Sequence, residues 1–385
     1  MNYWLQKYSD VGVVAEITGL MPQGKVHEFQ VMLHVSPIES NFSRQLQNLS
    51  KGLSELTKET LFGGAQPVFA RCFLSDASNQ YDLAKPAMDN LLDCPVSYVQ
   101  QPPLDGSKIA IWLQLETDVL CPDELTDGYE RNGYVHYYSV FNSSFLGKTE
   151  SSYTQTHLLL NAYERKLDLA GCSIADNCLR TWFFARDIDC DYKGVVEARK
   201  ENFQINGLTK DTHYIASTGI QGGAADYRTK VLMDTYAIKG IEKEQIRYLY
   251  ALDNMSPTYE YGVTFERGVS VDFGDRRRVL ISGTASIDKS GKILHEGDIE
   301  KQVSRMLDNV QALLHEADCD FGDLMQIIVY LRDVADYQNV KKRFDEQFPQ
   351  VPTAIVYAPI CRPGWLVEME CIAVKEIQNP QFRDL

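Results

Sequence analysis

Two carboxylates near the C-terminal end of the chain, Glu368 and Glu370, alternate with the apolar residues Val367, Met369 and Cys371. A carboxyl group can act as a general acid at neutral pH when burial raises its pKa, and Glu368 is our candidate for that role. The same alternation is typical of a strand with one solvated face. Exposure of Glu368 to water is therefore the alternative interpretation.

Cationic and hydroxyl-bearing side chains elsewhere in the chain could hold an acidic substrate. Arg362, Arg267, Tyr261 and Tyr214 are the candidates, because a carboxylate needs cations and hydrogen-bond donors. Each has a plainer alternative: Arg362 as a surface loop cation, Arg267 in a local ion pair with the neighbouring Glu266, and the tyrosines as packed aromatics.

Backbone groups and one thiol complete the candidate substrate contacts. The segment Ser217-Thr218-Gly219, with the pair Gly222-Gly223, predicts a turn whose backbone N–H groups bind a carboxylate. Cys361 is a further candidate substrate contact, although a packed thiol is the commoner role for a cysteine without a nearby histidine.

Other charged motifs have simpler explanations. Asp187, Asp189 and Asp191 lack the glycine and the glutamate of a calcium loop, so we interpret them as a solvated loop. The run Arg276–Arg278 is interpreted as the charge of a short hairpin turn. The seven histidines have no metal-ligand spacing, and we predict neither a metal nor another cofactor.

The net charge of −15 argues against nucleic acid as a partner, because phosphate binding needs clustered lysine and arginine. Nine cysteines without a Cys-x-x-Cys pair are typical of a reducing compartment. The first residues contain no apolar signal core, and no apolar run is long enough to span a membrane. We therefore predict a cytoplasmic protein without a membrane partner.

The clearest run of secondary structure extends from Val279 to Val374. It predicts strands at 279–288, 324–331, from Pro352, and 365–374, with a helix after the N-cap Asp298 and another over 337–348. The predicted order is β-α-β-α-β-β, an α+β unit with helices on one face of a sheet.

Two looser copies of this pattern precede it, so we predict three tandem units over 1–120, 121–240 and 241–385. The first copy has strands at 11–20, 26–35, 66–74, 96–99 and 108–115, and helices at about 41–58 and 80–92. The second, after a turn-rich link at 121–133, has strands at 134–141, 178–185, 213–217 and 228–238, and helices at 154–170 and 193–203. Repeated residues anchor the alignment: Asn48, Asn161 and Asn309; Asp76, Asp187 and Asp333; Pro95 and Pro352.

The last unit resembles the RidA/YjgF family, also described as endoribonuclease L-PSP. The matching residues are Ile281-Ser-Gly283, Gly297-Asp298-Ile-Glu300, Gln302, Asn309, Tyr330-Leu331-Arg-Asp333, Pro352-Thr353 and Val367-Glu368-Met-Glu370-Cys-Ile-Ala373. Proteins of this family are homotrimers of chorismate-mutase-like units with sites in the clefts between subunits. The resemblance therefore implies a fused pseudo-trimer, expected to be a monomer or a weak homo-oligomer.

RidA-type imine deaminases use an arginine shortly after the proline that begins the penultimate strand, and no copy has one there. The glutamate of the last strand is kept as Glu368. The second and third copies also resemble the chorismatases, which remove pyruvate from chorismate. That resemblance rests on Arg180-Thr-Trp182-Phe-Phe184, Glu197-Ala-Arg199-Lys-Glu201-Asn-Phe203, Ala216-Ser-Thr-Gly219-Ile220, Tyr261-Gly262, Phe265-Glu-Arg267, Gly283-Thr-Ala-Ser286, Cys361-Arg362 and Leu366-Val-Glu368-Met-Glu370.

One feature departs from the chorismatase pattern: Val263-Thr264 stands where that family has a Pro-Arg-Ser-Pro type segment. Three functions stay open. The first is a chorismatase-like hydrolase or lyase that acts on a small carboxylic acid, with Glu368 as its acid. The second is a deaminase of imines or enamines, and the third is a non-catalytic protein that binds a small acid. The acidic composition disfavours a ribonuclease.

Overall fold

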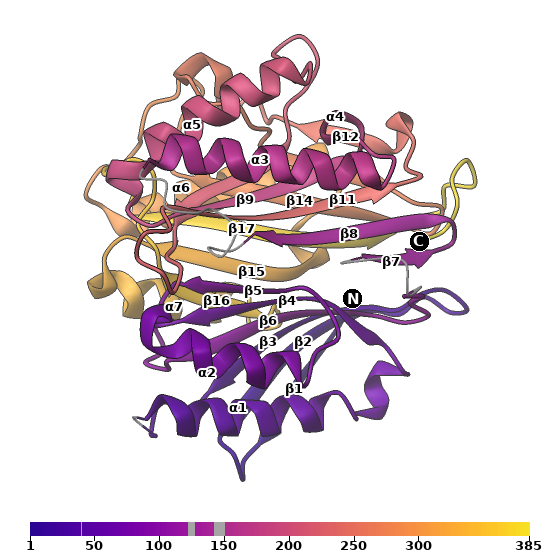
Figure 1. The fold of residues 1–385 in the computed structure, drawn as a ribbon, viewed down its shortest axis with the longest axis vertical. Helices are drawn as coiled ribbons and strands as arrows, with labels where there is room; N and C mark the ends of the chain where they lie inside the picture. The colour runs from indigo at the N-terminus through magenta and orange to yellow at the C-terminus, as the bar shows by residue number, and fades with distance from the viewer. Residues whose placement is uncertain (40, 122–127, 142–150) are drawn as a thin grey trace.

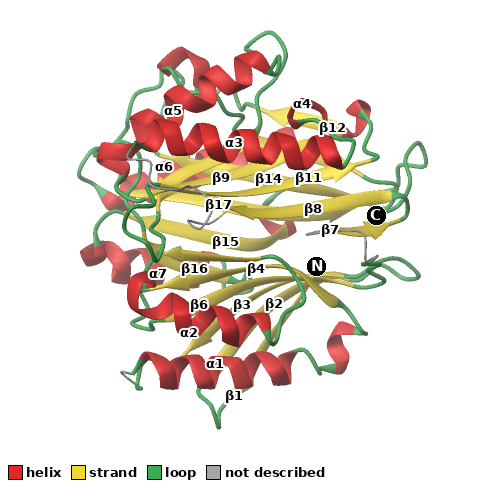
Figure 2. Cartoon of the chain, in the orientation of Figure 1, coloured by secondary structure: helices red, strands yellow, loops and turns green. Residues whose placement is uncertain are grey.

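The computed structural model describes residues 1–39, 41–121, 128–141 and 151–385. Three β-sheets face one another at the centre, and the helices lie on the outside (Figures 1 and 2). Helices α1 and α2 cover one end of the molecule, and α3 and α5 cover the opposite end. Within these ranges, no helix is both long enough and apolar enough to cross a bilayer.

The first sheet has the strand order β1-β2-β3-β6-β4-β5. Its elements are β1 Asn2–Tyr8, β2 Val13–Leu20, β3 Glu28–Val35, α1 Phe42–Leu56, β4 Gln66–Leu74, α2 Ala77–Asp89, β5 Val96–Gln100 and β6 Ile109–Glu116. Strand β1 is additional to the predicted strands. Helix α2 begins three residues earlier than predicted, directly after Asp76.

The second sheet has the order β7-β8-β11-β9-β10. Its elements are β7 Gly128–Arg131, β8 Tyr134–Phe141, α3 Ser152–Leu169, α4 Ile174–Asn177, β9 Cys178–Ala185, α5 Ile188–Ile205, β10 Ala216–Gln221 and β11 Val231–Lys239. Strand β7 lies in the predicted link at 121–133, of which residues 122–127 are outside the described ranges. Strand β10 begins three residues later than predicted.

The third sheet has the order β12-β13-β14-β17-β15-β16. Its elements are β12 Ile246–Leu249, β13 Gly268–Asp272, β14 Arg276–Ala285, α6 Ile299–Glu316, β15 Leu324–Leu331, α7 Tyr337–Gln347, β16 Thr353–Tyr357 and β17 Val367–Glu376. Strands β12 and β13 precede the predicted β-α-β-α-β-β order. Asp298 caps α6, as predicted, by accepting a hydrogen bond from the Lys301 N–H.

The three sheets share one arrangement, which confirms three fused units of the same α+β fold. In each, the last strand lies between the first hairpin and the middle strand, and the middle strand pairs in parallel with an edge strand. The strands of each sheet fall within one predicted unit, although the unit boundaries themselves stay predictions.

A buried glutamine marks the repeat. In each unit it lies four residues after the N-cap of the first long helix, and its Oε1 accepts the backbone N–H that precedes the last strand. These pairs are Lys108 to Gln45 (2.7 Å), Lys230 to Gln155 (2.7 Å) and Leu366 to Gln302 (2.9 Å).

The predicted asparagine anchors are wrong. Asn309 is buried and donates to the carbonyl oxygens of Ala285 and Ile287, whereas Asn48 is half-buried and Asn161 is exposed. Counted from the helix N-caps, the three asparagines occupy different positions. Asp76, Asp187 and Asp333 do correspond, because each is an N-cap residue. The helix that follows is an α-helix after Asp76 and Asp187 and a 3₁₀ helix after Asp333.

Buried ion pairs join the units at the centre. Arg276 and Arg278 each lie 3.0 Å from Glu28, and Arg278 lies 2.7 Å from Glu116. The prediction of a charged hairpin turn at 276–278 was therefore wrong, because these arginines belong to β14 and point into the first unit. Such pairs favour one arrangement of the units, since an unpaired buried charge is costly.

Candidate active site

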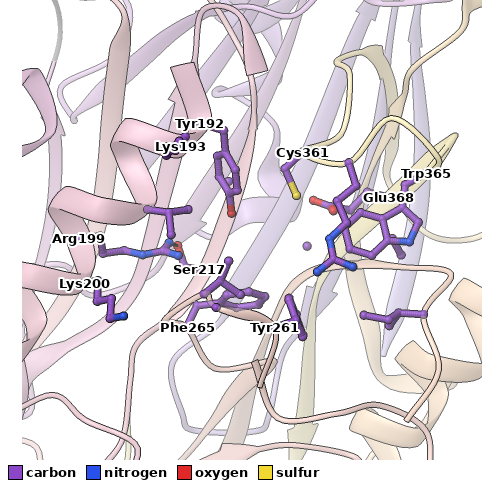
Figure 3. A pocket seen from close by; sticks show the side chains of 18 of the residues that line it. Tyr192, Lys193, Arg199, Lys200, Ser217, Tyr261, Phe265, Cys361, Trp365 and Glu368 are labelled. Carbon is purple, nitrogen blue, oxygen red and sulfur yellow. Dashed lines mark hydrogen bonds between the residues drawn. The ribbon is translucent and has the colours of Figure 1, made fainter. Parts of the chain in front are cut away.

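A cavity of about 410 Å³ lies between the second and third units. Helix α5 and strand β10 form one wall, and strands β14 and β17 with the segments at 261–267 and 361–365 form the other. Figure 3 shows Arg199 and Ser217 on one side and Glu368 and Trp365 on the opposite side. We call this space the first cavity.

Glu368 is buried and lines the first cavity, with 5% of its surface exposed. Strand β17 carries Glu368, and Gly283 on the adjacent β14 leaves room for its side chain. A Cβ atom at position 283 would overlap the carboxyl group. The interpretation of Glu368 as part of a solvated face is therefore wrong.

Burial raises the pKa of Glu368 to about 8, with a further contribution from the nearby charge of Glu370. Arg267 and Arg180 oppose this shift without cancelling it. At pH 7 the carboxyl group is therefore mostly protonated and can donate a proton into the cavity.

Arg362 and Arg267 lie on the same side of the cavity as Glu368, around the ring of Tyr261. The Arg362 guanidinium carbon is 4.6 Å from the Tyr261 ring centre and 4.9 Å from that of Trp365. Arg267 is buried, and its Nη2 donates to the Ser256 carbonyl oxygen at 3.1 Å. The predicted site residues Arg362, Arg267 and Tyr261 are thus brought together, and Arg362 is no isolated surface cation.

The 3₁₀ helix Thr258–Tyr261 positions Tyr261, and it ends at Gly262 with a φ of 89°. The Thr258 hydroxyl donates to the Phe265 carbonyl oxygen at 2.6 Å and closes the loop. This loop contains Val263-Thr264, the place where the sequence departs from the chorismatase pattern. Here Val263 lines the cavity without adding a charge.

Arg199 is a site residue that was not among the candidates. It projects from α5 with 1% of its surface exposed, and its Nη1 donates to the Ser217 hydroxyl oxygen at 3.3 Å. Among the described residues, its Nε and Nη2 have no hydrogen-bond partner. A buried guanidinium with free donors is suited to an anionic ligand.

Helical spacing could have identified Arg199. Tyr192, Val196 and Arg199 recur at i, i+4 and i+7 on α5, and all three line the cavity. The Tyr192 ring packs against Gly219, where a Cβ atom would approach the ring within 2.6 Å. Gly219, which also lines the cavity, is thus the residue that allows the Tyr192 ring to pack closely against β10.

The predicted backbone cradle at 217–223 is wrong, because this segment is strand β10 and its end. The Ser217 N–H donates to the Ser282 hydroxyl, and the N–H groups of Gly222 and Gly223 donate to carbonyl oxygens of Ala185 and Gln100. Ser217 still contributes its hydroxyl group to the cavity wall.

Thr218 points to the opposite face of β10 and does not line the first cavity. Its hydroxyl oxygen accepts hydrogen bonds from the Gly283 N–H (2.9 Å) and from Arg180, and the hydroxyl donates to Glu370. Thr218 thus ties the second unit to the strand that makes room for Glu368.

Tyr214 lines a separate pocket of about 230 Å³ with Glu266, so it is not part of the first cavity. Its backbone N–H donates to Glu266 at 2.7 Å, and burial raises the pKa of Glu266 to about 7. Arg267 lies between the two spaces and lines both.

Cys361 lines the first cavity, as predicted, but as a neutral thiol. Burial, and then the charge of Glu368, raise its pKa to about 12. A thiol in this state is a poor nucleophile, so its contribution is to packing.

Two remaining motifs concern metals. Asp187 caps α5 by accepting the Cys190 N–H, and Asp189 and Asp191 occupy its first turn, so the predicted solvated loop is wrong. In the described ranges, no group of His, Cys, Asp and Glu residues has the geometry to hold a metal ion.

Known proteins resemble this chain in sequence and in fold. The family described as endoribonuclease L-PSP matches residues 269–375. A RutC family protein of Pyrococcus abyssi is 32% identical over 100 residues, which are 26% of this chain and 79% of that protein. The chain belongs to the RidA/YjgF superfamily.

Other RidA/YjgF relatives include the human 2-iminobutanoate/2-iminopropanoate deaminase, 27% identical over 113 residues, or 29% of this chain and 80% of that protein. The crystal structure of a chorismatase covers 80% of this chain and 93% of its own, with 16% identity and a TM-score of 0.61. That likeness extends over more than one unit and concerns the fold.

The arginine expected of RidA-type deaminases is absent from β5, β10 and β16, the edge strands that pair in parallel with the middle strands. Two residues after Pro95 and Pro352 stand Ser97 and Ala354, and pairing with the middle strand places Thr218 at the same position in the second unit. The cations of the first cavity come instead from a helix and two loops.

Proposed function

We propose that the first cavity releases pyruvate from the enol ether of a chorismate-type dicarboxylate, with Glu368 as the general acid. The observation that carries this proposal is a buried, largely protonated carboxyl group in a cavity whose other charged side chains are mostly cationic. Five lysines and arginines line the cavity against two carboxyl groups, in a chain with a net charge of −15. A cationic cavity in an anionic protein selects and attracts anionic substrates.

Two walls can hold the two carboxylates of such a substrate. Arg362 and Arg267 lie beside Glu368 and would bind the carboxylate of the enolpyruvyl group. Arg199 lies across the cavity, and its free donors would bind the ring carboxylate. A volume of about 410 Å³ is within the range typical of small-molecule sites.

The reaction begins with proton transfer from Glu368 to the methylene carbon of the enol ether. The double bond supplies the electron pair for the new C–H bond, and the adjacent carbon becomes an oxocarbenium centre. Water adds to that carbon, and its surplus proton passes to the Glu368 carboxylate. The preceding transfer leaves Glu368 protonated again. As the bond from the hemiketal carbon to the ring oxygen then breaks, the proton of the hemiketal hydroxyl group passes to the ring oxygen, which gives pyruvate and a ring alcohol.

The position of Glu368 suits this first step. The methylene carbon is a weak base, so the acid must be protonated at the working pH and shielded from water. The pKa of about 8 and the burial of the side chain satisfy both needs. The flanking arginines would stabilise the carboxylate that forms as the proton leaves.

Purified protein incubated with chorismate tests the proposal. A coupled assay should detect pyruvate, and ultraviolet absorbance should separate a dihydrodiol, formed by hydrolysis, from a hydroxybenzoate, formed by elimination. Folded protein that releases no pyruvate at high enzyme concentration would contradict the proposal. Thermal stabilisation by chorismate without product would instead support a binding protein.

The third unit also favours a second candidate, deamination of an imine or enamine. The endoribonuclease L-PSP family matches this unit at residues 269–375, the human deaminase is similar to this chain over 113 residues, and the unit supplies Glu368. Such a reaction releases ammonia in place of pyruvate, so assaying both products with 2-iminobutanoate and with chorismate separates the two candidates. The missing strand arginine is the observation against it.

A further inference from the structure

A second cavity of the same size, about 410 Å³, lies between the first and third units. Strands β1, β2, β3 and β6 of the first unit form one wall, and helix α7 with strand β16 of the third unit forms the other. This second cavity is built from the same kinds of elements as the first, because β16 and α7 correspond to β10 and α5.

Strand pairing identifies the residue of each unit that corresponds to Glu368. In every unit, the residue three places before the aspartate N-cap pairs with the last strand. These pairs are Tyr330 with Glu368, Phe73 with Ala110, and Phe184 with Leu232. Ala110 lines the second cavity, so the position of the proposed acid holds a methyl group there.

The charge of the second cavity is opposite to that of the first. Three carboxylates, those of Glu16, Asp105 and Asp345, line it against Lys341 and His34. His34 lies between two of them, with its Nδ1 3.2 Å from Asp105 and its Nε2 4.0 Å from Glu16. Lys341 forms an ion pair with Asp345. Glu16 and Asp105 are therefore left with His34 alone, so these three groups carry a net negative charge even when the imidazole is protonated.

Glu16 keeps one oxygen free for a ligand. Its Oε2 accepts the Thr353 N–H at 2.9 Å and faces His34. Among the described residues, these interactions engage only Oε2, and Oε1 has no hydrogen-bond donor. The free Oε1 of Glu16 can therefore accept a hydrogen bond from a cationic ligand.

The rest of the wall is aromatic or apolar. Tyr3, Tyr337, Phe344 and Phe348 contribute rings, and Val351 and Ile355 contribute branched side chains. Aromatic rings pack against the apolar part of a ligand, and their faces also attract a neighbouring cation. We propose that the second cavity binds a small primary amine with an aromatic body, held by Glu16 through its ammonium group.

Calorimetry with 2-phenylethylamine as the probe tests this proposal, with 2-phenylethanol and 3-phenylpropionate as neutral and anionic analogues. We expect the amine to bind about tenfold more tightly than either analogue, because only the amine pairs with Glu16. Glu16→Gln should weaken amine binding about tenfold. This variant keeps an oxygen acceptor for the Thr353 N–H, so the fold should survive.

Two further variants locate the bound probe. Ala110→Phe fills the second cavity and should abolish binding, whereas Glu368→Gln alters only the first cavity and should leave binding unchanged. No binding of the amine at millimolar concentration would overturn the proposal. Binding that is as tight in Glu16→Gln and Ala110→Phe as in the wild type would also overturn it, because the amine would then bind elsewhere.

Discussion

The first and second cavities have the same size and the same strand framework but opposite chemistry. The first has a buried acid at position 368 and arginines from α5, from the loop before β13 and from the loop before β17. The second has Ala110 at the corresponding place and carboxylates in place of arginines. In a homotrimer the clefts must be identical, whereas three fused units allow each cleft to change separately. Function in this chain is therefore set by side chains that the shared fold does not dictate.

Removing the acid should have the largest effect. We expect Glu368→Gln to lower kcat for pyruvate release about 10³-fold, since a positioned general acid contributes roughly 10²–10⁴-fold. Far-ultraviolet circular dichroism should be unchanged. The matched change in the other cavity, Glu16→Gln, should leave kcat as it is. An active Glu368→Gln enzyme would mean that the difference between the cavities does not lie in this residue.

Moving the acid should have the next largest effect. A Cβ atom at Gly283 would overlap the Glu368 carboxyl group, so Gly283→Ala should displace it and lower kcat about 10²-fold. The measurement is steady-state kinetics together with the unfolding temperature. Gly64→Ala is a control for the added methyl group, because a Cβ atom there meets no neighbour, although its φ of 87° adds local strain. Unchanged kinetics in Gly283→Ala would contradict the assigned position of Glu368.

Removing a cation should affect binding more than turnover. Arg199→Ala should raise KM about 10- to 100-fold, because a hydrogen bond to a charged group contributes roughly 1.5–3 kcal/mol. Arg199→Lys should restore part of the loss. Lys341→Ala removes a cation from the second cavity and should leave KM unchanged. Equal effects of Arg199→Ala and Lys341→Ala would indicate a general change in charge.

The pH dependence should distinguish an acid from a base. Because Glu368 must be protonated, kcat/KM should be level below about pH 8 and fall about tenfold per unit above it. A rate that rises through this range would indicate a general base. The Glu368→Gln variant should lose this dependence together with its activity.

The raised pKa of Glu368 should also make the stability of the folded protein depend on pH, an effect smaller than those on activity. Glu368 keeps its proton in the folded state up to about pH 8, whereas the unfolded chain releases it near 4.5. Stability from this group is therefore full below about pH 4.5 and is lost as the pH rises toward 8. Denaturant unfolding should show the stability of Glu368→Gln rising relative to that of the wild type by about 1.4 kcal/mol per pH unit within that window.

Local sequence predicted most of the framework. The strands at 66–74, 178–185 and 324–331 are confirmed at both ends, because each is a buried apolar run bounded by polar residues. The helix start at Asp298 is confirmed because its side chain accepts the Lys301 N–H, whereas α3 begins two residues before the predicted position 154, after the N-cap Ser151. These features depend on neighbours within a few residues.

What the sequence missed depends on contacts between units. Arg276 and Arg278 look like a charged turn until Glu28, about 250 positions away in the chain, pairs with them. Arg199 lies on one face of α5, and its place in a cavity depends on residues of the third unit that form the opposite wall. Tyr214 is near Ser217 in sequence but reaches a different space.

Deuterium incorporation tests whether the enol ether takes a solvent-exchangeable proton, as donation from Glu368 requires. Chorismate is turned over in D₂O, the reaction is quenched early, and the pyruvate methyl group is examined by NMR. We expect one deuterium per methyl group in the wild type and no pyruvate signal from Glu368→Gln in the same time. Pyruvate with an undeuterated methyl group would contradict proton donation from Glu368, because the hydrogen would then have come from the substrate ring.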